Sequence, residues 1–542
     1  MRGGIGSQGM RPNASRQTIP PSGASQPDAP RAPTLRKVRI DPSSPIDDAD
    51  FTPAHARHLL WRAGFGGTPE QIHTLAAWGP ERSVDYLLNI DAIPFDAVAT
   101  DVFKSDIMRP ATAEERMAAR TAARAQDEES LARFRVMRQQ QERADRLQIR
   151  EVQEWWLARM VQTPRPLEEK MTLFWHGHFA TSYRTIENSY HMFRQNQLFR
   201  ANALGNFGTL MYGIIRDPAM LAYLDNNDSR KGRPNENLAR ELMELFSLGV
   251  GNYTEADIKE GARALTGYTF YDDEFEFRRD DHDNGKKSIL GRTGNLDGDG
   301  FVTAILEKRA CAKFMCRKLH RYFIADLPER ERDMDPQAKE FINELATLMI
   351  SRRYDIKPVL RRLLLSNRFY APEVMAQQIK SPVQLVVGAV RSLRTPARSL
   401  STLLDAMDLM GQSILFPPSV KGWDGGRTWI NTSTMFVRQN VLTYLLTGRK
   451  PQGRDAGASI ETYDPAFLVN ELAERDPSVR SDTDAMLRAM ARFVVGRDGD
   501  SLLAPVRAYV SGVVSEGGSA TSPATLTGIL LLLTASPEYQ LC

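Results

Sequence analysis

The segment LEEKMTLFWHGHF, residues 167–179, carries the apolar pattern that decides the fold of this chain. Met171, Phe174 and Trp175 stand at offsets 0, 3 and 4, and the next position of the same face, offset 7, is a histidine. This spacing predicts an α-helix from Leu167 onward with one face in a core. A helix that places a histidine on its apolar face needs a partner for the imidazole.

The two histidines of this segment allow two interpretations. His176 and His178 are two residues apart, which is about 200° around an α-helix. Both could bind one metal ion only if the helix opens at Gly177, a residue that tolerates such a break. In the alternative interpretation, both imidazoles cap backbone carbonyls or stack on Trp175 and Phe179.

A second helix is predicted over PNENLARELMELF, residues 234–246. Its core face carries Leu238, Leu242 and Leu245. Glu241 lies on that same face, and burial of a carboxylate is costly unless a cation or hydrogen-bond donors compensate it. The sequence therefore predicts a partner for this side chain: a metal ion, an arginine or a group of backbone donors.

After Gly267 the apolar period changes and predicts a small β-hairpin near residues 268–280. The hairpin leads into DDHDNGKK, residues 280–287, the most polar run of the body. His282 and Asp283 stand in the middle of this run. They are candidates for acid–base chemistry or metal binding.

These residues motivate the first functional hypothesis, a metal-assisted enzyme and more specifically a hydrolase, with zinc, iron or manganese as the divalent metal. The predicted metal ligands are His176, His178 and Glu241. The predicted catalytic residues are His282, Asp283 and Arg240. In this hypothesis His282 or Asp283 is a fourth ligand or the base for a bound water. Arg240, or Lys286 in its place, stabilises an anionic transition state.

Several motifs in a fixed order give a family resemblance. They are EKMTLFWHGHFATS (169–182), DPAMLAYLDNN (217–227), residues 234–249, ARALTG (262–267), HDNGKK (282–287), LGRTGN (290–295) and PPSVKGWDGGRTWINT (417–432). Together they resemble the bacterial domain-of-unknown-function 1800 family, from Phe51 to Cys542. The resemblance implies a mainly helical protein and no particular reaction. It also implies a sulfatase-like partner family, and relatives that are often expected to be exported.

Bulk composition excludes several classes of protein. The chain has 70 basic and 67 acidic residues, a net charge of +3, which is a poor footprint for nucleic-acid binding. Its three cysteines form no disulfide framework and no thiolate metal site. No apolar run is long enough to cross a membrane. Nucleophile-elbow, Walker, H-E-x-x-H and C-x-x-C motifs are also absent from the sequence.

The sequence predicts three regions in a mainly α protein. Residues 1–50 are rich in Pro, Ser and Gly and are predicted to be a disordered arm. Residues 51–450 form a large multi-helix body, within which 111–162 is one long charged helix or a helical hairpin. Residues 451–542 form a C-terminal helical segment packed on the body. No standard signal peptide is visible, so the default compartment is cytoplasmic. Because relatives are often expected to be exported, the compartment stays unassigned.

Two alternatives to the enzyme remain open. In the first, the chain is a non-catalytic helical scaffold or a helper of a sulfatase-like partner, and the His and Trp motifs lock helix ends. In the second, Trp423 and Trp429 bind carbohydrate, which requires both rings to be exposed and coplanar. Geometry separates these hypotheses, because a metal site requires its ligands to converge within a few Å.

Overall fold

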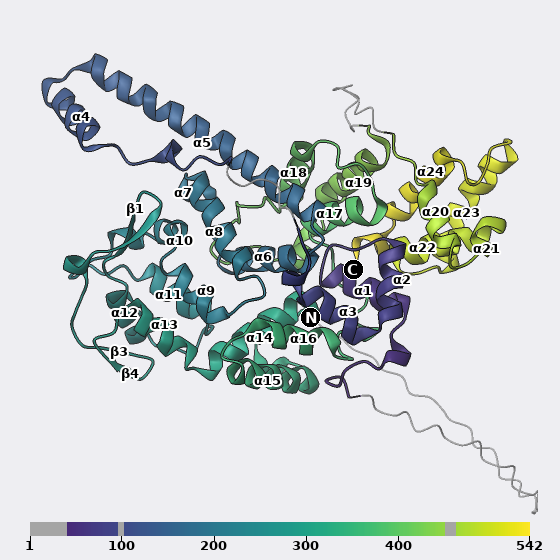
Figure 1. The fold of residues 1–542 in the computed structure, drawn as a ribbon, viewed down its shortest axis with the longest axis horizontal. Coiled ribbons are helices and arrows are strands. Elements are labelled where there is room, and N and C mark those ends of the chain that lie inside the picture. Colours follow the sequence, from purple (N-terminus) through teal and green to yellow (C-terminus); the bar gives the residue numbers. More distant parts are fainter. Residues whose placement is uncertain (1–40, 96–101, 450–461) are drawn as a thin grey trace, which may run out of the picture. The chain divides into compact units, whose positions relative to one another are not determined.

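The computed structural model describes residues 41–95, 102–449 and 462–542 (Figure 1). These residues form 24 α-helices and two antiparallel two-stranded sheets, which confirms the predicted mainly α fold. Most of the predicted disordered arm lies outside the described residues. Residues 41–50 are described, and there the Ile46 N–H donates to the Leu365 carbonyl at 2.9 Å.

The first helices begin where the sequence places capping residues. α1 begins at Pro53, directly after Thr52, and the Thr52 N–H donates to His55 Nδ1 at 3.1 Å. The second helix starts with a capping box in which Thr68 and Gln71 exchange hydrogen bonds. The first three helices of the chain are α1 (Pro53–Arg62), α2 (Pro69–Trp78) and α3 (Pro80–Leu88).

Residues 111–162 form a helical hairpin, the second of the two predicted alternatives. Its helices are α4 (Ala113–Ala125) and α5 (Glu128–Gln162). The break occurs at Gln126, which has a left-handed φ of 51°, and Asp127 caps α5 by accepting the Ser130 N–H at 3.1 Å. α4 packs on α5, and Figure 1 shows the hairpin extending away from the neighbouring helices. Only the second half of α5, from Asp145 to Met160, supplies buried residues.

α6 (Pro166–His178) is buried on every side, including its polar residues. Glu169 pairs with the guanidinium groups of Arg159 and Arg200 and accepts from Trp156 Nε1 at 2.9 Å. Burial opposes ionisation, but the two arginines hold the pKa of Glu169 below its usual range. α6 packs against α3, α5 and α8. The helices that follow α6 in the chain are α7 (Tyr183–Ile186), α8 (Ser189–Ala201), α9 (Phe207–Ile214), α10 (Pro218–Tyr223), α11 (Asn237–Glu244) and α12 (Glu255–Ala264).

Two small hairpins follow α12. In the first, β1 (Tyr268–Tyr271) pairs antiparallel with β2 (Glu274–Phe277), which confirms the predicted hairpin. The sequence pattern does not predict the second, β3 (Lys287–Ile289) and β4 (Arg292–Gly294), because its strands have only three residues each. Its turn has left-handed φ values of 51° at Leu290 and 83° at Gly291.

The remaining helices complete the unit that extends from Asp41 to Cys542. The predicted boundary at residue 450 lies next to residues 450–461, which are outside the described part, and it stays a prediction. Among the described helices, none combines the length and the apolar character that a membrane crossing requires. The remaining helices are α13 (Gly298–Leu306), α14 (Arg309–Phe323), α15 (Pro336–Ser351), α16 (Ile356–Leu365), α17 (Pro382–Leu393), α18 (Leu400–Leu409), α19 (Thr432–Thr447), α20 (Ala466–Ala473), α21 (Ser478–Ser481), α22 (Thr483–Val495), α23 (Asp500–Ser515) and α24 (Pro523–Ala535).

Candidate functional site

His176, near the end of α6, is fixed by a backbone hydrogen bond. Its Nε2 accepts the Leu415 N–H at 3.1 Å, so the imidazole proton is assigned to Nδ1. The rings of Trp156 and Trp423 pack edge-on against it, each with a centroid distance of 5.5 Å. Burial lowers the pKa of His176 to about 3, so the ring is neutral. This histidine ties α6 to the segment around Leu415.

The loop that contains Trp423 and Trp429 closes over the end of α6. A Cβ atom on Gly422 would lie 2.2 Å from the Gly177 carbonyl oxygen, and Gly422 has a φ of 77°. α6 continues to His178, so the helix does not open at Gly177. Trp429 is only 6% exposed. The pair of exposed rings that carbohydrate binding requires is therefore not formed.

His178 lies among aromatic side chains. Its Nε2 donates to the Phe246 carbonyl at 2.9 Å, and its buried Nδ1 makes no hydrogen bond within the described chain. The rings of Phe179 and Phe174 lie 4.6 and 5.9 Å away. Burial, with a contribution from the charge of Lys318, holds the pKa of His178 well below its usual value. The neutral ring fixes the end of α11 to α6.

His282 and Asp283 hold the turn between the two hairpins. His282 Nδ1 lies 2.8 Å from the Thr266 carbonyl, to which it donates, and its ring packs edge-on against Phe277. Asp283 forms an ion pair with Arg263, with Oδ2 2.7 Å from Nε. The hydrogen bond from Arg263 lowers the pKa of Asp283 to about 2. The side chains of His282 and Asp283 thus have partners inside the fold.

Arg240 lies on the outer face of α11. Its guanidinium pairs with Glu236 at 3.2 Å, as the i,i+4 spacing predicts, and with Glu255 of α12 at 3.0 Å. These pairs join two helices at the surface. They occupy the group that was predicted to stabilise an anionic transition state.

Glu241 differs from the other predicted site residues. Its side chain is half-buried, and its Oε2 atom is buried without a hydrogen-bond partner in the described chain. Burial and the nearby Glu244 raise the pKa of Glu241, whereas the charges of Arg240 and Lys421 oppose that rise. Burial and the Glu241 carboxylate raise the pKa of Tyr223. Side chains from three separate sequence motifs thus interact around this carboxylate.

The structure gives the predicted metal ligands different partners. No hydrogen bond or ring contact joins any two of His176, His178, Glu241 and His282 in the described chain. Within residues 41–95, 102–449 and 462–542, no group of three His, Cys, Asp or Glu side chains is arranged to hold a metal ion. Assignment of His176, His178 and Glu241 as ligands stays a prediction.

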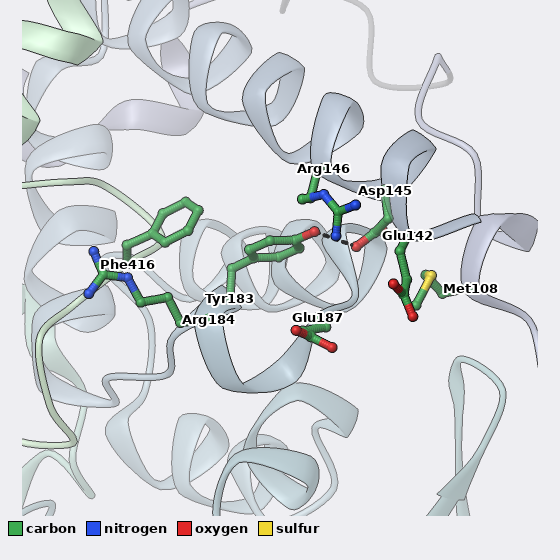
Figure 2. A pocket seen from close by; sticks show the side chains of 8 residues that line it. All are labelled: Met108, Glu142, Asp145, Arg146, Tyr183, Arg184, Glu187 and Phe416. Carbon is green, nitrogen blue, oxygen red and sulfur yellow. Dashed lines mark hydrogen bonds between the residues drawn. The ribbon is translucent and has the colours of Figure 1, made fainter. Parts of the chain in front are cut away.

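A cavity that the sequence does not predict lies where α5 meets α7 (Figure 2). Its volume is about 210 Å³. Two aromatic rings, a methionine and five charged side chains line it: Met108, Glu142, Asp145, Arg146, Tyr183, Arg184, Glu187 and Phe416. The only signal in the sequence is Asp145, an acidic residue one turn before the buried Gln148 and Ile149 of α5.

Asp145 is the buried wall of this cavity. Its carboxylate accepts from Tyr183 Oη at 2.7 Å, from Ser189 N at 2.9 Å and from Ser189 Oγ at 2.6 Å. Figure 2 shows the Tyr183 ring reaching across the cavity to this carboxylate. Burial and the hydrogen bond to Asp145 raise the pKa of Tyr183. α5 is thereby joined to α7 and to the start of α8.

Comparison with known families agrees with the motif pattern. A family model described as a protein of unknown function, DUF1800, matches residues 58–541. The chain belongs to the DUF1800 family. No curated protein and no solved structure is significantly similar to it.

The DUF1800 match includes the hairpin, the cavity and the surroundings of Glu241. Residues 58–541 contain the α4–α5 hairpin, the cavity at its base, and Glu241 with its neighbours. These features therefore lie in the DUF1800 region of the chain, and the family description assigns no reaction to any of them. The function has to be argued from the geometry.

Proposed function

We propose that this DUF1800 protein is a non-catalytic helical scaffold that binds a partner protein through the α4–α5 hairpin. One observation carries the proposal: the hairpin presents large apolar side chains to solvent. Met117, Val136 and Leu147 are 70%, 51% and 62% exposed. Apolar side chains grouped on an exposed helix favour association with another helix or groove.

Val136 and Leu147, the two most exposed large apolar residues of α5, share a face. Val136 and Leu147 are eleven residues apart, close to three turns at about 3.6 residues per turn. Ion pairs also form along the helix: Glu129, which lies on this face two turns before Val136, pairs with Arg133 at 2.5 Å, and Arg138 pairs with Glu142 at 3.0 Å. Such pairs keep an exposed helix soluble while its apolar stripe remains available.

The base of α5 holds the hairpin in a fixed direction. Trp156 and Leu157 are fully buried, and Arg159 pairs with Glu168 at 3.1 Å and also with Glu169. Buried ion pairs of this kind favour one arrangement of the helices over others. A partner that meets a preformed helix does not have to compensate for the entropy of ordering it.

The histidine contacts support the same function. His176, His178 and His282 each use a ring nitrogen on a backbone group, and none of these nitrogens faces an open site. Side chains used in this way hold helix ends and loops together. That role is the one expected of motif residues in a scaffold.

The partner to test first is the sulfatase-like protein that the family resemblance implies. Biolayer interferometry would measure its binding to the full chain and to a Val136→Glu/Leu147→Glu double variant. We expect the double variant to bind at least about tenfold more weakly, because two apolar anchors are replaced by charges. Val250→Glu is the matched control, since Val250 is 78% exposed and lies outside the hairpin.

Equal affinities of the two variants would refute the hairpin as the binding surface. Absence of any complex with the wild-type chain would exclude the sulfatase-like partner. In that case, size-exclusion chromatography with other proteins encoded beside the gene would be the next assay of the hairpin. Retained binding by a chain that lacks residues 113–145 would also refute the proposal.

The metal-assisted hydrolase is the second candidate, and Glu241 is the observation that favours it. The Glu241 side chain is half-buried, and its buried Oε2 atom has no hydrogen-bond partner in the described chain. A cation would satisfy this oxygen. Elemental analysis of protein purified without a chelating tag would test it, on the wild-type chain and on Glu241→Ala and His176→Ala. Stoichiometric metal in the wild type that is lost in both variants would support the hydrolase. Metal-free wild-type protein would refute it.

A further inference from the structure

The cavity between α5 and α7 contains charged groups that the fold does not use. Asp145 is satisfied by three donors, and Glu142 pairs with Arg138. The side chains of Arg146, Arg184 and Glu187 make no hydrogen bond or ion pair within the described chain. Two cations and one anion therefore face the same space without protein partners.

The two arginines lie apart in the cavity (Figure 2). In Figure 2, Arg184 lies beside Phe416 on the left, Arg146 lies beside Asp145 to the right of the Tyr183 ring, and Glu187 lies below that ring. Each guanidinium offers parallel N–H donors suited to a carboxylate. The carboxylate of Glu187 accepts from an ammonium or hydroxyl group.

The backbone at Glu187 is an independent sign of a built site. Glu187 has a left-handed φ of 48°, and its N–H donates to the Tyr183 carbonyl at 2.9 Å as the cap of α7. Glutamate is disfavoured in this conformation relative to glycine, which has no β-carbon, and relative to asparagine, whose short side chain can hydrogen-bond locally. Strain of this kind concentrates at functional sites. At this turn Glu187 places a carboxylate at the cavity, whereas a glycine at the same position would have no side chain there.

We infer that this cavity binds a small zwitterion of the α-amino acid class. The ligand carboxylate pairs with the free guanidinium of Arg184, with Arg146 at the far end, and the ligand ammonium pairs with Glu187. Tyr183 and Phe416 supply apolar walls for the side chain. A volume of about 210 Å³ is below the range of about 300–1,000 Å³ for drug-sized ligands, which fits a single small metabolite.

Isothermal titration calorimetry of the full chain against the twenty common L-amino acids would test this inference. For any amino acid that binds, the matched probes are its N-acetyl derivative and its amide, which remove the ammonium and the carboxylate separately. We expect each derivative to bind at least about tenfold more weakly, because each loses one charge-assisted pair. No binding by any amino acid would overturn the inference. An N-acetyl form that binds as well as the parent would show an anion site and would also overturn it.

Variants locate the binding. Arg184→Ala removes an exposed side chain without an internal partner, and Glu187→Asn removes the charge while keeping a residue that tolerates a left-handed backbone. Each is expected to weaken binding about tenfold to a hundredfold. Arg143→Ala is the matched control, since Arg143 is exposed on α5 and does not line the cavity. Unchanged affinity in both cavity variants would refute this cavity as the binding site. If a variant fails to fold, the N-acetyl and amide derivatives still test the inference on the wild-type chain.

Discussion

Lys170 is the buried group whose replacement gives the sharpest test of this structure. It lies on α6 at 2% exposure, and its Nζ has no hydrogen-bond partner in the described chain. The rings of Phe65 and Tyr322 lie 5.3 and 5.4 Å from Nζ. Burial lowers the pKa of Lys170 to about 7, although the charge of Cys542 opposes this change.

The lowered pKa predicts both the size and the sign of a pH effect. A fall from 10.5 to about 7 corresponds to about 5 kcal/mol, at about 1.4 kcal/mol per pH unit. Below pH 7 both states carry the proton, so the folded state bears the full cost of the buried charge. Between pH 7 and 10.5 the unfolded state binds more protons, so stability rises with pH. Above pH 10.5 both states are neutral and the cost is absent.

The assay compares the free energies of unfolding of the wild type and Lys170→Met from pH 6.5 to pH 10. Methionine keeps a long apolar side chain against the two rings. We expect the variant to be more stable by up to about 5 kcal/mol near pH 7, and its advantage to shrink by about 1.4 kcal/mol per pH unit above that. Lys259→Met, at an exposed site of α12, is the control and should show no such slope. A difference between Lys170→Met and wild type that does not change with pH would refute the buried, unpaired lysine.

Three further predictions concern the region around α6 and α11. Gly422→Ala should lower the thermal unfolding temperature more than Gly251→Ala does. Both glycines have left-handed φ values, but only at Gly422 would the new Cβ collide with a backbone carbonyl. Equal decreases in unfolding temperature would contradict this steric argument. His176→Ala leaves the buried Leu415 N–H unpaired, at a cost of about 1–3 kcal/mol in a denaturant titration; an unchanged midpoint would contradict the contact. Glu241→Gln should raise the unfolding temperature at pH 7, because burial raises the pKa of Glu241, and the gain should disappear as pH falls toward 4.5; a lowered temperature together with lost metal would instead favour the hydrolase.

The helical fold follows from patterns that are local in the sequence. Thr52 before Pro53 starts α1, and Thr254 with Asp257 forms the capping box that starts α12. The hairpin β1–β2 appears where the apolar period changes. These features depend on residues within one or two turns of each other, so one sequence is enough to predict them.

The candidate site is less predictable because its partners are far apart in the chain. His176 meets Leu415, 239 residues away, and Glu169 meets Arg200, 31 residues away. Periodicity gives α6 one apolar face, yet the helix is buried all round, because Arg159 and Arg200 supply the charges that Glu169 needs. A helical wheel shows which residues are costly to bury and does not show what compensates them.

The same physical demand explains why polar motifs in apolar surroundings are ambiguous in function. Helix ends and loops inside the body leave carbonyl and N–H groups without backbone partners, and side chains must satisfy them. His178 does this for the Phe246 carbonyl, and His176 does it for the N–H of Leu415. Each imidazole is held neutral by burial, which suits a hydrogen bond with the backbone as well as it suits a metal. Glu241 satisfies no such backbone group. The scaffold hypothesis therefore predicts that Glu241→Gln raises the unfolding temperature, whereas the hydrolase hypothesis predicts a lower temperature and loss of metal. Arg146, Arg184 and Glu187 are unused by the fold in the same way, and for that reason their cavity is where we expect a ligand.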